Sequence, residues 1–129
     1  MARNFRSIQA WKFSDDLAVT VYEATKMFPS EERYGLISQM RRAAVSVPAN
    51  IAEGATRSSQ REYAQFLSIA KGSLAELEYY LHLSKRLRYM NDSEHDRLFQ
   101  LQQLVGRVLH GLLKSVVQKT HLGDTVGVS

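Results

Sequence analysis

The sequence predicts an all-α protein, folded as an antiparallel up-down-up-down four-helix bundle. Apolar residues recur at spacings of three and four rather than two, which is the period of a helix. Only two prolines and seven glycines interrupt the 129 residues. The links between the predicted helices are short, and a short link makes the chain double back, so that neighbouring helices run antiparallel. We expect one bundle domain over residues 1–122 and a disordered tail over residues 123–129.

The first helix is predicted from Ile8 to Met27, where Phe28, Pro29 and Ser30 break the pattern. Its core stripe is expected to contain Ile8, Trp11, Ala18, Val21, Tyr22 and Thr25.

The second helix is predicted from about residue 34 to residue 56, and it contains Pro48. Because proline lacks an N–H and clashes with the preceding turn, a kink is expected near Pro48. The carbonyl of Ala44 then needs another donor, which Asn50 or a neighbouring helix could supply. The expected core stripe contains Leu36, Met40, Ala44, Val47, Ile51 and Ala55.

The third helix is predicted to begin with a capping box, in which Ser59 and Glu62 satisfy free N–H groups of the first turn. It continues to about Tyr89. A turn over residues 91–93 leads into the fourth helix, whose apolar residues nearly follow a seven-residue repeat. Gly123 is expected to stop this helix after Leu122.

The composition limits the possible functions. With no cysteine, the chain has no disulfide, thiolate metal site or cysteine nucleophile, which suits a reducing cytoplasm. We expect neither a signal peptide nor a membrane-spanning segment. The net charge of +4 and pI of about 9.5 favour an acidic partner such as nucleic acid, although a small positive excess on a solvated surface is the alternative.

A narrow polar stripe on the second helix has apolar or small residues on both flanks, so this helix is predicted to be covered on more than one side. Charges in such a setting need partners. The third helix has a second arc of small and polar residues around Gly72, which would admit another helix closely. We therefore predict a homo-oligomer held by a structural or interface network of Gln39, Arg42, Ser46, Asn50, Glu53, Gly72 and Glu76.

Two long motifs resemble a known family. They are FP-x-E-x-x-YGL-x-x-Q-x-RRA-x-x-S-x-x-x-NIAEG-x-x-R at residues 28–57 and FL-x-IA-x-GSL-x-ELE at residues 66–78. They are similar to the four-helix-bundle proteins encoded by intervening sequences of bacterial 23S ribosomal RNA genes, with which the accessory variability protein of diversity-generating retroelements belongs. The resemblance implies a bundle assembled as a ring-like pentamer with basic surfaces. In the retroelement branch it also implies nucleic-acid binding and a reverse transcriptase as partner, and it implies no catalytic residues.

The functional hypothesis is a non-enzymatic, oligomeric adaptor whose basic surface binds RNA or DNA without reading its sequence. The alternative is a protein-binding scaffold whose charges serve assembly, and a small-molecule binder or enzyme is the third reading. We expect no cofactor and no metal, because His82, His95, His110 and His121 lack the Glu-x-x-His spacing of metal-binding bundles. Four tyrosines could stack on bases, although tyrosines in helical bundles usually pack at the edge of the core: Tyr63, Tyr79, Tyr80 and Tyr89. The proposed nucleic-acid contacts are Arg41, Arg57, Arg61, Lys85, Arg86 and Arg88.

Overall fold

The structure is a computed structural model that describes the backbone of residues 3–128 and the side chains of residues 3–120. Within this range the chain forms four α-helices and two 3-10 turns, with no strand, which confirms the all-α prediction. Their bounds are η1 Phe5–Ser7, α1 Gln9–Thr25, η2 Ser30–Glu32, α2 Leu36–Ala55, α3 Gln60–Arg86 and α4 Asp92–Val128.

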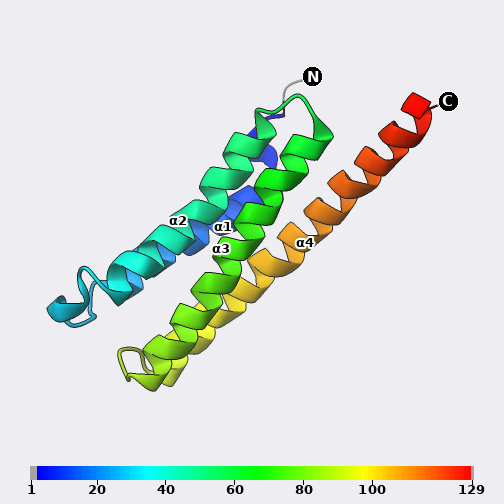
Figure 1. Cartoon of the computed structure of the whole chain (residues 1–129). Coiled ribbons are helices and arrows are strands. Elements are labelled where there is room, and N and C mark those ends of the chain that lie inside the picture. Colours follow the sequence, from blue (N-terminus) through cyan, green and yellow to red (C-terminus); the bar gives the residue numbers. More distant parts are fainter. Residues whose placement is uncertain (1–2, 129) are drawn as a thin grey trace.

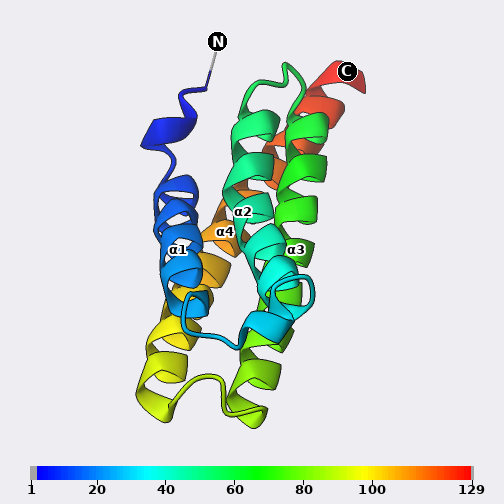
Figure 2. The ribbon, with the colours of Figure 1, turned by 90° about the vertical axis from the view of Figure 1, so that its left-hand side faces the viewer.

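The helices form a bundle in which each packs against two others. The contacts join α1 to α2, α2 to α3, α3 to α4, and α4 back to α1. Successive helices run in opposite directions, so α1 begins and α4 ends at one end of the bundle, while the α3–α4 link closes the other end (Figures 1 and 2). The link between α2 and α3 therefore lies far from the link between α3 and α4.

One apolar stripe from each helix forms the core. Fully buried side chains include Leu17 of α1, Met40 of α2, Leu77 of α3 and Leu98 of α4. Burying a side chain of this size stabilises the fold by about 1.5–3 kcal/mol. The predicted place of Tyr22 in the core is wrong, because this residue is 41% exposed at the edge of α1.

The helix ends differ in part from the prediction. The Ser59 hydroxyl accepts a hydrogen bond from the Glu62 N–H at 3.2 Å, so Ser59 caps α3 as predicted, while the return bond of the Glu62 side chain stays a prediction. The prediction that Gly123 ends the fourth helix is wrong, because the backbone of α4 stays helical as far as Val128. A glycine ends a helix by adopting a left-handed conformation, and no described glycine has a positive φ. Inside a helix it costs only about 1 kcal/mol against alanine.

Pro48 lies buried inside α2, which continues from Leu36 to Ala55 without a break. The bend of its axis stays a prediction. The Asn50 amide does not serve the Ala44 carbonyl; it donates to the Ser46 carbonyl at 2.8 Å and to the Ser46 hydroxyl at 2.9 Å. The Asn50 side chain therefore stabilises the turn that surrounds the proline.

Candidate nucleic-acid interface

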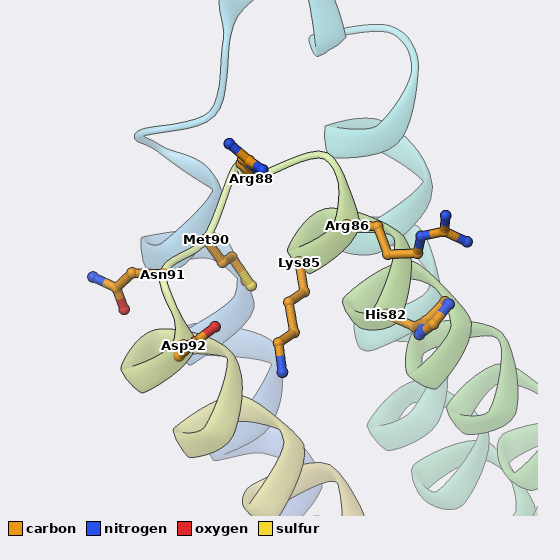
Figure 3. A pocket seen from close by; sticks show the side chains of 7 residues that line it. All are labelled: His82, Lys85, Arg86, Arg88, Met90, Asn91 and Asp92. Atoms are coloured by element: carbon orange, nitrogen blue, oxygen red, sulfur yellow. The ribbon is translucent and has the colours of Figure 1, made fainter.

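Three exposed cations lie where α3 ends. Lys85 and Arg86 occupy the last turn of α3, and Arg88 lies in the link to α4. All three line a depression of about 780 Å³, which we call the basic depression. Its lining residues are His82, Lys85, Arg86, Arg88, Met90, Asn91 and Asp92 (Figure 3).

The chain leaves α3 through a Schellman turn, in which the link donates back to the last carbonyls of the helix. The Tyr89 N–H donates to the Ser84 carbonyl at 2.9 Å, and the Arg88 N–H donates to the Lys85 carbonyl at 3.0 Å. This turn needs a left-handed residue, a position usually filled by glycine. Here Arg88 fills it with φ 62°, the only positive φ among the described non-glycine residues. The turn therefore holds a cation at a position where a side chain is strained.

The α3–α4 link is anchored to the start of α2. The Tyr89 hydroxyl donates to Glu32 Oε2 at 2.8 Å, and Glu32 Oε1 accepts from the Leu36 N–H at 3.3 Å. The hydrogen bond to Glu32 is the main cause that raises the pKa of Tyr89. The Tyr89 ring also packs on Phe28, with ring centroids 5.4 Å apart. These contacts fix the link and thus the basic depression beside it.

The cations of the basic depression do not all point the same way. Lys85 extends into the space beside the first turn of α4, whereas Arg86 and His82 project to one side and Arg88 projects away from the helix end (Figure 3). Asp92 lies on the same depression as the one acidic lining residue. The arrangement spreads positive charge over the end of the bundle, which suits an extended polyanion better than a single small anion.

An aromatic pocket of about 420 Å³ adjoins the basic depression and shares His82 with it. Its lining residues are Ala75, Glu78, Tyr79, His82, His95 and Phe99. Tyr79 is 57% exposed and Phe99 is 38% exposed. The His95 and Phe99 rings lie nearly parallel, with an interplanar angle of 13° and centroids 5.8 Å apart. The pocket is therefore lined by aromatic and imidazole rings from both α3 and α4.

The other predicted nucleic-acid residues lie elsewhere. Arg57 and Arg61 flank the α2–α3 link, and the 24-residue separation of Arg61 from Lys85 corresponds to about 36 Å along α3. Arg57 pairs with Glu53 at 3.0 Å and stacks on Phe66 at 4.7 Å from the ring centroid. Arg61 is exposed and also makes an interaction within the chain. The structure thus places Arg57 and Arg61 at the opposite end of the bundle from the basic depression.

Arg41 contacts the end of α1 instead of extending into solvent. Its Nε donates to the Thr25 hydroxyl at 2.9 Å, and its Nη2 donates to the Tyr22 carbonyl at 3.2 Å. Its guanidinium lies 4.6 Å from the Tyr22 ring centroid. A cation at the C-terminus of a helix is favourable because the free carbonyls there carry negative charge. These contacts give Arg41 a role in joining α1 to α2.

The predicted interface network is only partly assembled within the single chain. The Ser46 and Ser73 hydroxyls lie 2.8 Å apart and join α2 to α3, and Asn50 donates to Ser46. By contrast, the chain's own helices leave the two charged members Arg42 and Glu53 exposed. These two charges are therefore not enclosed within a single subunit, and their burial in an assembly stays a prediction. Three further members of the network are also exposed, namely Gln39, Gly72 and Glu76.

Gly54 brings α2 and α3 into close contact. It is buried inside α2, and a Cβ built on it would lie 2.7 Å from the Cβ of Phe66 and 3.1 Å from Cδ1 of Tyr63. A glycine inside a run of helix-forming residues is the only sign of this contact in the sequence. The sequence does not show which helix lies opposite the glycine.

Other structural contacts had no clear signal in the sequence. Arg3 donates to the Arg57 carbonyl at 2.6 Å and lies 4.2 Å from the Tyr63 ring centroid, which ties the N-terminal segment to the end of α2. Burial raises the pKa of Tyr63, and the charge of Arg3 partly opposes this effect. Gln102 is 4% exposed and donates to the Leu74 carbonyl at 3.1 Å.

The described side chains contain no group of three or more His, Cys, Asp or Glu that could hold a metal ion. The side chain of His121 lies outside this range. None of the described helices combines the length and the apolar character that crossing a lipid bilayer requires.

Comparison with known proteins identifies the family. A solved structure of a protein of unknown function from the S23 ribosomal protein family of Bacteroides thetaiotaomicron matches with a TM-score of 0.76 and 24% identity, over 81% of this chain and 95% of that one. At this identity the match shows the shared fold. No curated protein matches the chain. The model of the 23S rRNA-intervening sequence proteins matches residues 6–111, and the chain therefore belongs to this family.

Proposed function

We propose that the protein is a non-enzymatic, cytoplasmic adaptor that binds nucleic acid through its basic surface without reading the sequence. The basic depression carries this proposal, because it places the exposed cations Lys85, Arg86 and Arg88 on one end of the bundle. Lysine and arginine gain affinity for phosphates by releasing condensed counterions, and such contacts do not distinguish bases. RNA and DNA are both suitable ligands for this surface.

Assembly would strengthen this binding. The exposed charges Arg42 and Glu53 and the open space around Gly72 support a homo-oligomer, for which we propose the pentameric ring of the resembling proteins. Each subunit would then contribute one basic depression. Once one depression is bound, the others meet the same strand at high effective concentration, so that weak contacts add to a stable complex.

The salt dependence of binding tests the proposal. The test variant combines Lys85→Ala, Arg86→Ala and Arg88→Gly, since glycine suits the left-handed conformation at residue 88. Each lost phosphate contact should reduce the slope of log K against log salt by about 0.7 for a single strand, or about 2 for the three contacts of one basic depression. Between about 50 and 200 mM salt, this change corresponds to roughly 20-fold in relative affinity.

A charge-matched control variant uses three exposed lysines elsewhere, Lys12, Lys71 and Lys114, each changed to alanine. Fluorescence anisotropy with labelled RNA and DNA measures both variants. The control should keep the slope of the unmodified protein, and equal slopes for test and control would refute the assignment to the basic depression. Absence of binding at about 50 mM salt would refute nucleic-acid binding altogether.

A specific observation favours the scaffold alternative. An apolar hollow of about 460 Å³ lies between α1 and α2 and contains Val19, Tyr22 and Val45. Val19 is 54% exposed, and Tyr22 and Val45 are each 41% exposed, so the hollow joins three exposed apolar residues in one patch, and contiguous apolar patches mark interaction sites. Light scattering of Val19→Lys and Val45→Lys variants tests whether this face joins subunits. A fall in mass supports the scaffold, whose further partner could be a reverse transcriptase, and an unchanged mass contradicts this use of the face.

A further inference from the structure

We infer that the ligand is single-stranded, with its phosphates on the basic depression and one or more unstacked bases in the adjoining aromatic pocket. This inference rests on the proposed nucleic-acid function and specifies its substrate class. Aromatic side chains bind single strands by stacking on bases, and stacking tolerates any sequence because every base has a flat face. In a duplex the bases are already stacked and paired, so they cannot enter such a pocket.

The geometry of the pocket suits a flat ligand. Tyr79 and His82 line it from α3, with ring centroids 6.3 Å apart, and His95 and Phe99 line it from α4. Ala75, the smallest lining residue, leaves space between these rings. The high exposure of the Tyr79 ring, despite its apolar faces, means that a stacked base would remove apolar surface from water.

Charge separates the two parts of the surface. Glu78 is the acidic residue of the aromatic pocket, and its Oε1 accepts a hydrogen bond from Gln103 Nε2 at 2.6 Å, which holds the carboxylate in place. A carboxylate repels phosphate, whereas the cations of the basic depression attract it. Since Tyr79 and Arg86 lie two helical turns apart, about 10 Å along α3, one strand can contact both parts. The base therefore belongs in the aromatic pocket and the backbone in the basic depression.

An abasic strand separates stacking from phosphate binding. Anisotropy measurements compare labelled oligothymidine, an abasic DNA strand of equal length with the same phosphates, and a duplex. Oligothymidine should bind more tightly than the abasic strand. Tyr79→Leu should weaken oligothymidine binding by about 5-fold to 160-fold, the range for loss of one base–aromatic stack, and leave abasic binding unchanged. Tyr79→Phe keeps the ring and should retain full affinity.

Ile69→Ala is the matched control, because Ile69 is an exposed apolar residue of α3 that lies ten residues before Tyr79, about 15 Å along the helix. It should not change the affinity for any strand. Equal binding of oligothymidine and the abasic strand, or an unchanged affinity for Tyr79→Leu, would overturn the inference while leaving the proposed function intact. A change of oligomeric mass in Tyr79→Leu would also overturn it, by placing the pocket in a subunit contact. Failure of every strand to bind at low salt would refute the proposed function itself.

Discussion

Substitution of Gly54 by alanine should destabilise the bundle, although alanine is the better helix former. The added Cβ would lie 2.7 Å from the Cβ of Phe66, and real Cβ atoms essentially never approach so closely. Because the Phe66 Cβ is attached directly to the backbone of α3, rotation of the ring cannot relieve this contact. The helices α2 and α3 must separate, or one of them must shift along the other.

The expected cost follows from two opposing terms. Overpacking a well-packed contact costs about 1–3 kcal/mol, while replacing glycine by alanine inside a helix contributes about 1 kcal/mol in favour of folding. Because the clash involves the fixed part of Phe66 and also Cδ1 of Tyr63, we expect a net loss of about 1–2 kcal/mol. For a chain of this size, each kcal/mol corresponds to roughly 4 °C in Tm.

Thermal and urea unfolding measure this difference, and Gly111→Ala is the matched control. Gly111 lies within α4 with no atom within 4 Å of a built Cβ, so alanine there adds only helix propensity. We expect the control to raise the free energy of unfolding by about 1 kcal/mol, which sets the two variants about 2–3 kcal/mol apart. Equal effects of the two substitutions would refute the close α2–α3 contact at Gly54.

Three further predictions concern the link, the assembly and the response to alkali. Arg88→Gly should stabilise the protein by about 0.5–1 kcal/mol in thermal unfolding, because glycine adopts a φ of 62° without strain, yet weaken nucleic-acid binding by removing a cation; a loss of stability would contradict the strain argument. Gly72→Ala should stabilise an isolated subunit by about 1 kcal/mol, but should lower the oligomeric mass in light scattering if another subunit packs at Gly72, and an unchanged mass would exclude this contact. The pKa values of Tyr63 and Tyr89 are both raised above 10.0, so the fold favours the neutral phenols; their contribution to stability is present below about pH 10 and is lost as the pH rises through the folded pKa values. Urea unfolding across this range should show a shallower alkaline decline for Tyr63→Phe and Tyr89→Phe, and a decline as steep as that of the unmodified protein would contradict these assignments.

Part of the candidate site was predictable from the sequence. Lys85, Arg86 and Arg88 could be identified because three cations lie within four residues at the end of the third helix, and the structure leaves them exposed. Arg41 shows the limit of this reasoning. It was one of the predicted nucleic-acid contacts, but the C-terminus of α1 lies opposite and binds its guanidinium. A charged residue on a helix surface can be assigned only when the neighbouring helix is known.

The aromatic pocket was beyond prediction for a related reason. Tyr79 was a candidate for stacking, but nothing in the sequence placed Phe99 or His95 beside it, since they lie on a different helix. Likewise, the Tyr89–Glu32 hydrogen bond joins residues 57 positions apart in the sequence. It forms because the α1–α2 link and the α3–α4 link lie beside each other at one end of the bundle. Contacts of this kind follow from how far each helix extends, which local periodicity does not specify.

The sequence by itself determined the helical character, the order of the four helices, most of their core stripes and the family, because the 3.6-residue period and the long motifs are local properties of the chain. Only the tertiary structure decided which side chains from different helices meet. It separated Arg57 and Arg61 from Lys85 by most of the length of α3, left Arg42 and Glu53 exposed, and brought Tyr79 beside Phe99. The physical reason is that helix formation depends on neighbours along the chain, whereas a surface that binds a partner depends on the rotation and offset with which separate helices pack.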